Sequence, residues 1–87
     1  MKLQYKLNQH LLGRNAAQLV YSTNQLPCGV SIYRKDQTTC INAKSFVGIL
    51  SGYYKGGDTI TIFIDNPECS NRVKEIFNEY GVEIWFF

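Results

Sequence analysis

Alternating polar and apolar residues open the chain. Over residues 2–7 every second side chain is apolar, which is typical of a strand with one buried face. Between residues 13 and 24 the apolar spacing changes to three and four, and this period predicts a helix. The shared helical face carries Leu12, Ala16, Leu19, Val20 and Thr23. Pro27 ends the helix because its ring cannot continue the hydrogen-bond ladder.

The middle of the chain predicts a hairpin and then a short helix. Residues 29–34 and 38–42 have the composition of two strands, and the polar residues 35–37 form the turn between them. Ser45 directly precedes a cluster of apolar residues, a pattern typical of a helix N-cap. We therefore expect a short helix that runs to about Tyr53.

The last third contains the clearest strand, over residues 59–65, where β-branched and aromatic side chains dominate. Asp65, Asn66 and Pro67 favour a helix start. This helix carries an apolar stripe from Cys69 to Tyr80, and Gly81 is placed to cap its end. Residues 82–87 predict a further short strand. The order β-α-β-β-α-β-α, with a possible C-terminal strand, predicts an α+β fold in which one antiparallel sheet carries the helices on one face.

Length and charge limit the function classes. Eighty-seven residues fit a single domain, 1–87. The 45% hydrophobic content is typical of a folded globule, and no apolar run is long enough to span a bilayer. The N-terminus alternates charged and apolar residues and so does not resemble a signal peptide. The basic residues are scattered and offset by seven acids, so we expect neither a nucleic-acid partner nor a membrane partner.

Three cysteines, Cys28, Cys40 and Cys69, are scattered along the chain and form no C-x-x-C pair. An odd count with this spacing is not a disulfide framework, so we expect reduced thiols in a cytoplasmic protein. A metal site built from these cysteines and His10 would need ligands from four distant segments. We therefore expect no metal and no cofactor.

Two segments carry a family pattern. The stronger is residues 42–51 (NAKSFVGILS), followed after a loop by residues 58–62 (DTITI), and the weaker is residues 11–20 (LLGRNAAQLV). Both resemble the histidine-containing phosphocarrier protein, HPr, of the bacterial sugar phosphotransferase system. The resemblance implies an open-faced β-sandwich of four antiparallel strands and three helices, and it implies protein partners of the phosphotransferase or carbon-control system.

The resemblance also implies a departure at the reactive position. The family pattern there is Gly, an aliphatic residue, His, Ala, Arg, Pro and Ala, and in this alignment Leu12 takes the place of the active histidine. Phosphoryl transfer needs an imidazole nitrogen as nucleophile, and an alkyl side chain has no lone pair. Arg14 matches the family arginine and could bind an anion together with the N–H groups of the helix start.

His10 is the only histidine of the chain, so it is the only alternative phosphoacceptor. It precedes the expected position by two residues, a shift that a loop can accommodate. The competing interpretation is a solvated imidazole at the end of a strand.

Ser45 has two compatible interpretations. Its hydroxyl can cap the following helix, a contribution of about 1 kcal/mol. The resemblance also implies a regulatory phosphorylation site at this serine, where a phosphate would add roughly −2 charge beside an apolar surface.

Apolar side chains near both motifs predict a surface for docking to a protein partner or to a second copy of the chain. These residues are Leu11, Leu12, Phe46, Val47 and Leu50. The alternative is that they complete the core. The aromatic tail, residues 85–87, predicts an edge strand, packing beneath the third helix, or a dimer contact.

The combined prediction is an HPr-like protein that is degenerate at the usual histidine. It is not a catalyst, and it acts as a regulatory or docking module in sugar uptake or carbon control. One alternative is a working phosphocarrier that uses His10. A second alternative is a structural or oligomerising module.

Overall fold

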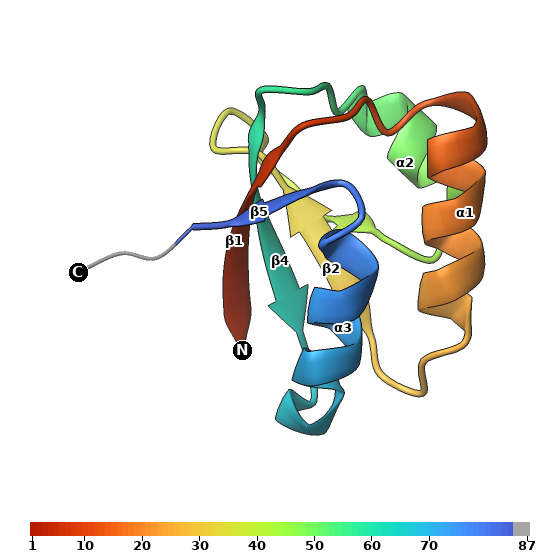
Figure 1. Cartoon of the computed structure of the whole chain (residues 1–87), viewed down its shortest axis with the longest axis vertical. Helices are drawn as coiled ribbons and strands as arrows, with labels where there is room; N and C mark the ends of the chain where they lie inside the picture. The colour runs from red at the N-terminus through yellow and green to blue at the C-terminus, as the bar shows by residue number, and fades with distance from the viewer. Residues whose placement is uncertain (85–87) are drawn as a thin grey trace.

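The computed structural model describes residues 1–84. A five-stranded antiparallel sheet in the order β3-β2-β4-β1-β5 carries the helices on one of its faces (Figure 1). The elements are β1 (Lys2–Leu7), α1 (Gly13–Asn24), β2 (Val30–Tyr33), β3 (Ile41–Asn42), α2 (Phe46–Gly52), β4 (Thr59–Ile64), the 3-10 turn η1 (Pro67–Cys69), α3 (Ser70–Phe77) and β5 (Gly81–Glu83). The α+β prediction is confirmed. β5 overlaps only the start of the strand predicted over residues 82–87, and residues 85–87 lie outside the described part of the chain.

The core lies between the helices and one face of the sheet. Alternate residues of β1, β2 and β4 are buried there, as their period of two requires. They are Leu3, Tyr5, Leu7, Val30, Ile32, Ile60, Ile62 and Ile64. The predicted helical face of α1 is confirmed, since Ala16, Leu19 and Thr23 are buried. On the opposite face of the sheet, residues 1–84 place no helix (Figure 1).

Three boundaries differ from the prediction. β3 is reduced to two residues, because the Gln37 side chain accepts the Arg34 N–H at 2.7 Å in place of a ladder bond. α3 is preceded by η1, whose cap is Asn66, while Asp65 accepts the Gly29 N–H at 2.9 Å. The prediction that Gly81 caps the helix is wrong. The C-cap is Asn78, and Gly81 lies in β5 where a Cβ would meet the Lys6 carbonyl oxygen.

The expectation of three reduced thiols is wrong for two of them. Cys28 and Cys69 form a disulfide, with their Cα atoms 6.5 Å apart and a separation of 41 positions in sequence. The loop after α1 and the turn before α3 meet at this point, where Gly29 and Asp65 also bind each other through backbone and side chain. Cys40 is a free and exposed thiol.

No helix within residues 1–84 has the length and hydropathy needed to cross a membrane. The predicted role of the aromatic tail falls on residues 85–87, which lie outside the described part of the chain.

Candidate docking site

The two resemblance segments meet at one end of the molecule, the upper end in Figure 1, where α2 lies beside the start of α1. Backbone hydrogen bonds join the loop after β1 to residues 53–58, the loop after α2. The Leu11 N–H donates to the Tyr54 carbonyl at 2.9 Å, and the Gly57 N–H donates to the Leu7 carbonyl at 2.7 Å. Residues far apart in sequence therefore form one continuous surface here.

Leu12 is the residue directly before α1. Its backbone is extended, with φ −129° and ψ 158°, and its side chain makes no capping hydrogen bond. The side chain is half-buried, whereas its neighbour Leu11 is fully buried. The prediction that Leu11 contributes to docking is therefore wrong, because a side chain with no exposed area cannot touch a partner.

His10 is exposed and lies on the loop after β1. Its Nδ1 accepts the Gly56 N–H at 2.9 Å. An acceptor nitrogen uses its lone pair for the hydrogen bond. The bond to Gly56 must therefore break before Nδ1 can attack a phosphoryl group, and the role of His10 as a phosphoacceptor stays a prediction.

Arg14 is exposed in the first turn of α1. It lines a hollow whose other residues are Ala17, Gln18, Tyr21, Ser22 and Glu79. That lining includes neither Leu12 nor Ser45, and it includes the acidic Glu79. The anion-binding role expected for Arg14 stays a prediction.

Ser45 caps α2 as the sequence predicted. Its hydroxyl oxygen accepts the Gly48 N–H at 3.0 Å, and its backbone is extended. The side chain is half-buried at the start of the helix. A phosphate at this oxygen would replace the capping bond and place charge next to Phe46 and Val47.

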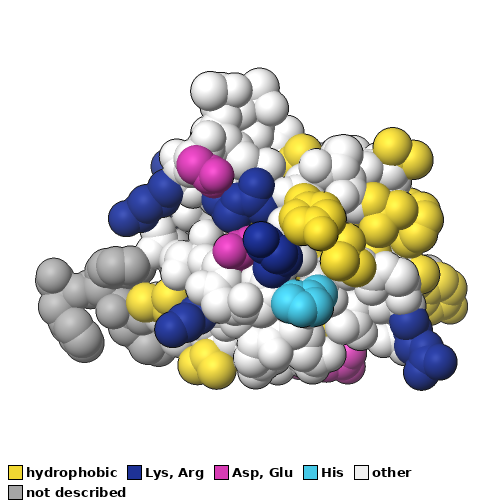
Figure 2. All heavy atoms as spheres, turned by 90° about the horizontal axis from the view of Figure 1, so that it is seen from above, with side chains coloured by type: hydrophobic (Ala, Val, Ile, Leu, Met, Phe, Trp, Pro, Cys, Tyr) yellow, Lys and Arg dark blue, Asp and Glu magenta, His cyan; other side chains and the backbone are white. Residues whose placement is uncertain are grey.

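Hydrophobic side chains gather on the upper face beside the single histidine (Figure 2). Val47 is 75% exposed, Tyr53 58% and Phe46 42%. Leu50 is half-buried and packs against the core, as its alternative interpretation predicted. We call the set of Leu12, Phe46, Val47, Leu50 and Tyr53 the apolar patch.

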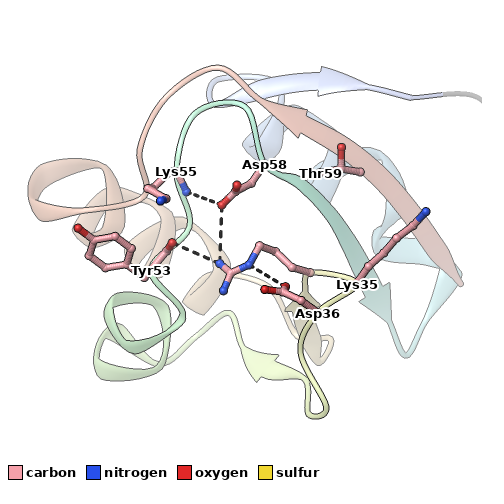
Figure 3. A pocket seen from close by; sticks show the side chains of 7 residues that line it. Lys35, Asp36, Tyr53, Lys55, Asp58 and Thr59 are labelled. Carbon is pink, nitrogen blue, oxygen red and sulfur yellow. Dashed lines mark hydrogen bonds and ion pairs between the residues drawn. The ribbon is translucent and has the colours of Figure 1, made fainter.

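A charged hollow of about 450 Å³ lies between the loop after α2 and the turn after β2 (Figure 3). Arg34 lines this hollow, and 22% of its side-chain area is exposed. Its Nε lies 3.1 Å from Asp36, and its Nη1 lies 3.7 Å from Asp58 and 2.6 Å from the Gly52 carbonyl. The guanidinium also covers the Tyr54 ring, 5.0 Å from its centroid.

Tyr54 forms the floor under Arg34. The ring is fully buried, and its hydroxyl donates to Gln37 at 2.9 Å. Burial raises the pKa of Tyr54, and the Gln37 hydrogen bond and the Arg34 charge oppose this shift. The phenol is therefore neutral at physiological pH and acts as a structural group.

A sequence profile of the family described as "PTS HPr component phosphorylation site" matches residues 2–78, which is most of the chain. The chain belongs to this HPr family. Proteins of this family interact with other proteins of the phosphotransferase system. The predicted family is confirmed, and the chain is a phosphocarrier-like protein.

Solved HPr structures share the fold. HPr-C-His from Thermoanaerobacter tengcongensis is 19% identical, with a TM-score of 0.72 over 90% of this chain and 85% of that chain. The histidine-containing phosphocarrier protein of Mycoplasma is 19% identical, with a TM-score of 0.76 over 91% and 93%. The phosphocarrier protein HPr from Bacillus anthracis str. Ames is 25% identical, with a TM-score of 0.75 over 92% and 93%. A search of the curated proteins gave no significant match.

Among the residues that sequence reasoning selected in this HPr-family chain, Leu12, Ser45, Phe46 and Val47 are at least partly exposed at one end of the molecule. The reasoning missed Arg34 and Asp58. Arg34 is 18 residues from its nearest α2 carbonyl, and no local pattern marks a contact of this range. The only signal was the adjacent basic pair of Arg34 and Lys35.

Proposed function

We propose that this HPr-family chain is a docking or regulatory protein of sugar uptake or carbon control that does not carry phosphate at the usual position. The observation that carries the proposal is Leu12 at the residue directly before α1, where the alignment with the family pattern expects the active histidine. A hydrocarbon there cannot be phosphorylated, and it adds to the exposed apolar area of the upper end.

A phosphoryl-transfer assay tests the chemical half of this proposal. The wild type is mixed with the general donor enzyme of the phosphotransferase system and labelled phosphoenolpyruvate. We expect no acid-labile label on the wild type and a gain of label in Leu12→His, because that variant returns an imidazole to the start of α1. Label on the wild type that disappears in His10→Ala would overturn the proposal.

That last outcome is the second candidate function, a phosphocarrier that uses His10. The favouring observation is that His10 is exposed on the upper face, next to the apolar patch (Figure 2). The Gly56 hydrogen bond opposes it, since the loop must release Nδ1 before this nitrogen can attack.

Binding tests the docking half. The general donor enzyme serves as the probe in calorimetry, and proteins captured from a native lysate serve as further probes. Val47 is 75% exposed, so Val47→Asp places a charge in the patch without disturbing the core. We expect at least a tenfold loss of affinity for Val47→Asp and for Ser45→Asp. Equal affinities for the wild type and both variants would contradict docking through the patch.

Self-association is the structural alternative. Light scattering across concentrations, with Leu12→Asp as the control, distinguishes a homodimer from a monomer. A dimer that Leu12→Asp dissociates would favour the oligomerising module.

The cytoplasmic location stays a prediction. Disulfides persist in oxidising compartments. Alkylation of thiols in fresh lysate would show whether Cys28 and Cys69 are joined in the cell.

A further inference from the structure

The end of α2 needs external support. The helix has seven residues, and helices of this length are marginal without tertiary contacts. Its C-cap is Tyr53, in the left-handed region at φ 53° and ψ 50°. Residues other than glycine seldom adopt this conformation. Something outside the helix therefore has to hold Tyr53 in place.

Arg34, the residue directly after β2, provides that support. Its Nη1 donates to the Gly52 carbonyl at 2.6 Å and to the Tyr53 carbonyl at 3.2 Å. These are the last carbonyls of α2, where the helix dipole is negative and a cation is favourable. Figure 3 shows the guanidinium reaching from the turn after β2 to the Tyr53 carbonyl.

The guanidinium is itself fixed from several directions. Asp36 and Asp58 lie at 3.1 and 3.7 Å from its nitrogens. The same Asp58 carboxylate accepts the Lys55 N–H at 2.9 Å, so it holds the loop as well as the arginine. Because Tyr54 packs below, the arginine has little freedom to move, and the loop conformation at Tyr53 is fixed with it.

The conformation of Tyr53 determines where its side chain lies in the apolar patch. Tyr53 is exposed and forms the edge of the patch that is closest to the charged hollow. The Lys55 ammonium lies 5.4 Å from the centroid of its ring. We propose that Arg34 is a positioning residue for docking, which presents the Tyr53 ring to a partner by fixing the left-handed end of α2. This inference rests on the proposed docking function and extends it.

Arg34→Lys is the decisive variant, because it keeps the positive charge but loses the planar fork that reaches both carbonyls and both carboxylates. In the free protein we expect hydrogen exchange at the Tyr53 amide, which donates to the Leu50 carbonyl at 3.2 Å, to accelerate about tenfold. We expect affinity for the donor enzyme to fall about three- to tenfold. Arg72→Lys is the matched control, since it makes the same exchange at an exposed residue of α3, and both readouts should stay at wild-type values.

A double-mutant cycle separates positioning from general destabilisation. If Arg34 acts through the Tyr53 ring, then Arg34→Lys has no further effect on affinity once Tyr53→Ala is present. Independent, additive losses of affinity would overturn the proposal, and so would unchanged exchange and affinity in Arg34→Lys.

The two proposals fail in different ways. If neither the wild type nor Val47→Asp binds, the docking function is wrong and this inference falls with it. If the wild type binds, Val47→Asp does not, and Arg34→Lys equals the wild type in both measurements, docking stands and the positioning role is wrong.

Discussion

The two ends of the molecule are held together by different kinds of contact. At the lower end in Figure 1, the loop after α1 and the turn before α3 are joined covalently through Cys28 and Cys69. At the upper end, α2 and its loops are held by polar contacts to Arg34, His10 and Asp58. The end that carries the apolar patch is therefore the end held by hydrogen bonds and ion pairs, which can break and re-form. Binding surfaces often lie in such adjustable parts of a rigid scaffold.

Loss of the disulfide is the strongest test of this contrast. Closing a loop between residues 41 positions apart stabilises the folded state by about 4 kcal/mol in the loop-entropy estimate. We expect the double variant Cys28→Ser/Cys69→Ser to lose about this much in chemical denaturation. Cys40→Ser, which removes the free and exposed thiol, should match the wild type.

The double variant Cys28→Ser/Cys69→Ser also checks that the two ends are independent. Affinity for the donor enzyme should be unchanged at a temperature where the variant is folded. A large loss of affinity without unfolding would show that the disulfide also shapes the patch.

Sequence reasoning found what local patterns determine. α1 and β4 lie where their periods predicted, and Ser45 caps α2, because periodicity and capping depend on residues within a few positions of each other. The disulfide was missed because pairing is a property of the folded chain, and spacing alone favoured no bridge.

The site was predictable only in part, for the same reason. The sequence placed Leu11 and Leu12 together in the docking set, but the start of α1 buries one and leaves the other partly exposed. Arg34 reaches carbonyls 18 and 19 residues away, so its role depends on how the hairpin packs on α2. Such contacts become visible only when the tertiary structure is known.

High pH tests the contact between the sheet and α3. The buried Tyr5 hydroxyl donates to Asn78 at 2.8 Å. Burial, with a smaller effect of the nearby Glu83, raises the pKa of Tyr5 from 10.0 to about 12. Because the folded-state pKa lies above the unfolded value, the neutral phenol stabilises the protein below pH 10 and this stability is lost as the pH rises to 12.

The expected loss over that range is on the order of 2 kcal/mol. Denaturation curves at several pH values would measure it, with Tyr5→Phe as the control that lacks the ionisable group. Its stability should fall less steeply than that of the wild type, and parallel curves would contradict the assignment to Tyr5.

Gly52→Ala disturbs only the upper end. A Cβ at this residue would meet the ring of Tyr54, which is fixed below Arg34, so the end of α2 must shift. Overpacking of this kind costs about 1–3 kcal/mol. The matched control is Gly56→Ala, whose added Cβ finds its nearest atom, in the Asn8 backbone, at 3.4 Å and should change stability little. Hydrogen exchange should rise in α2 and stay at wild-type values in α3, and a uniform rise would show that the two ends unfold together.

The smallest effect concerns the cap of α2. Ser45→Ala removes the acceptor of the Gly48 N–H, and the loss of such a cap costs about 1 kcal/mol. Ser51→Ala is the matched control, because the exposed Ser51 hydroxyl only donates to a carbonyl within the same helix, that of Gly48. Urea denaturation of both variants measures the difference. If Ser45→Ala is as stable as Ser51→Ala, the hydroxyl of Ser45 contributes little to the fold. The reason to expect a role for it in regulation would then be its partly exposed position beside Phe46 and Val47.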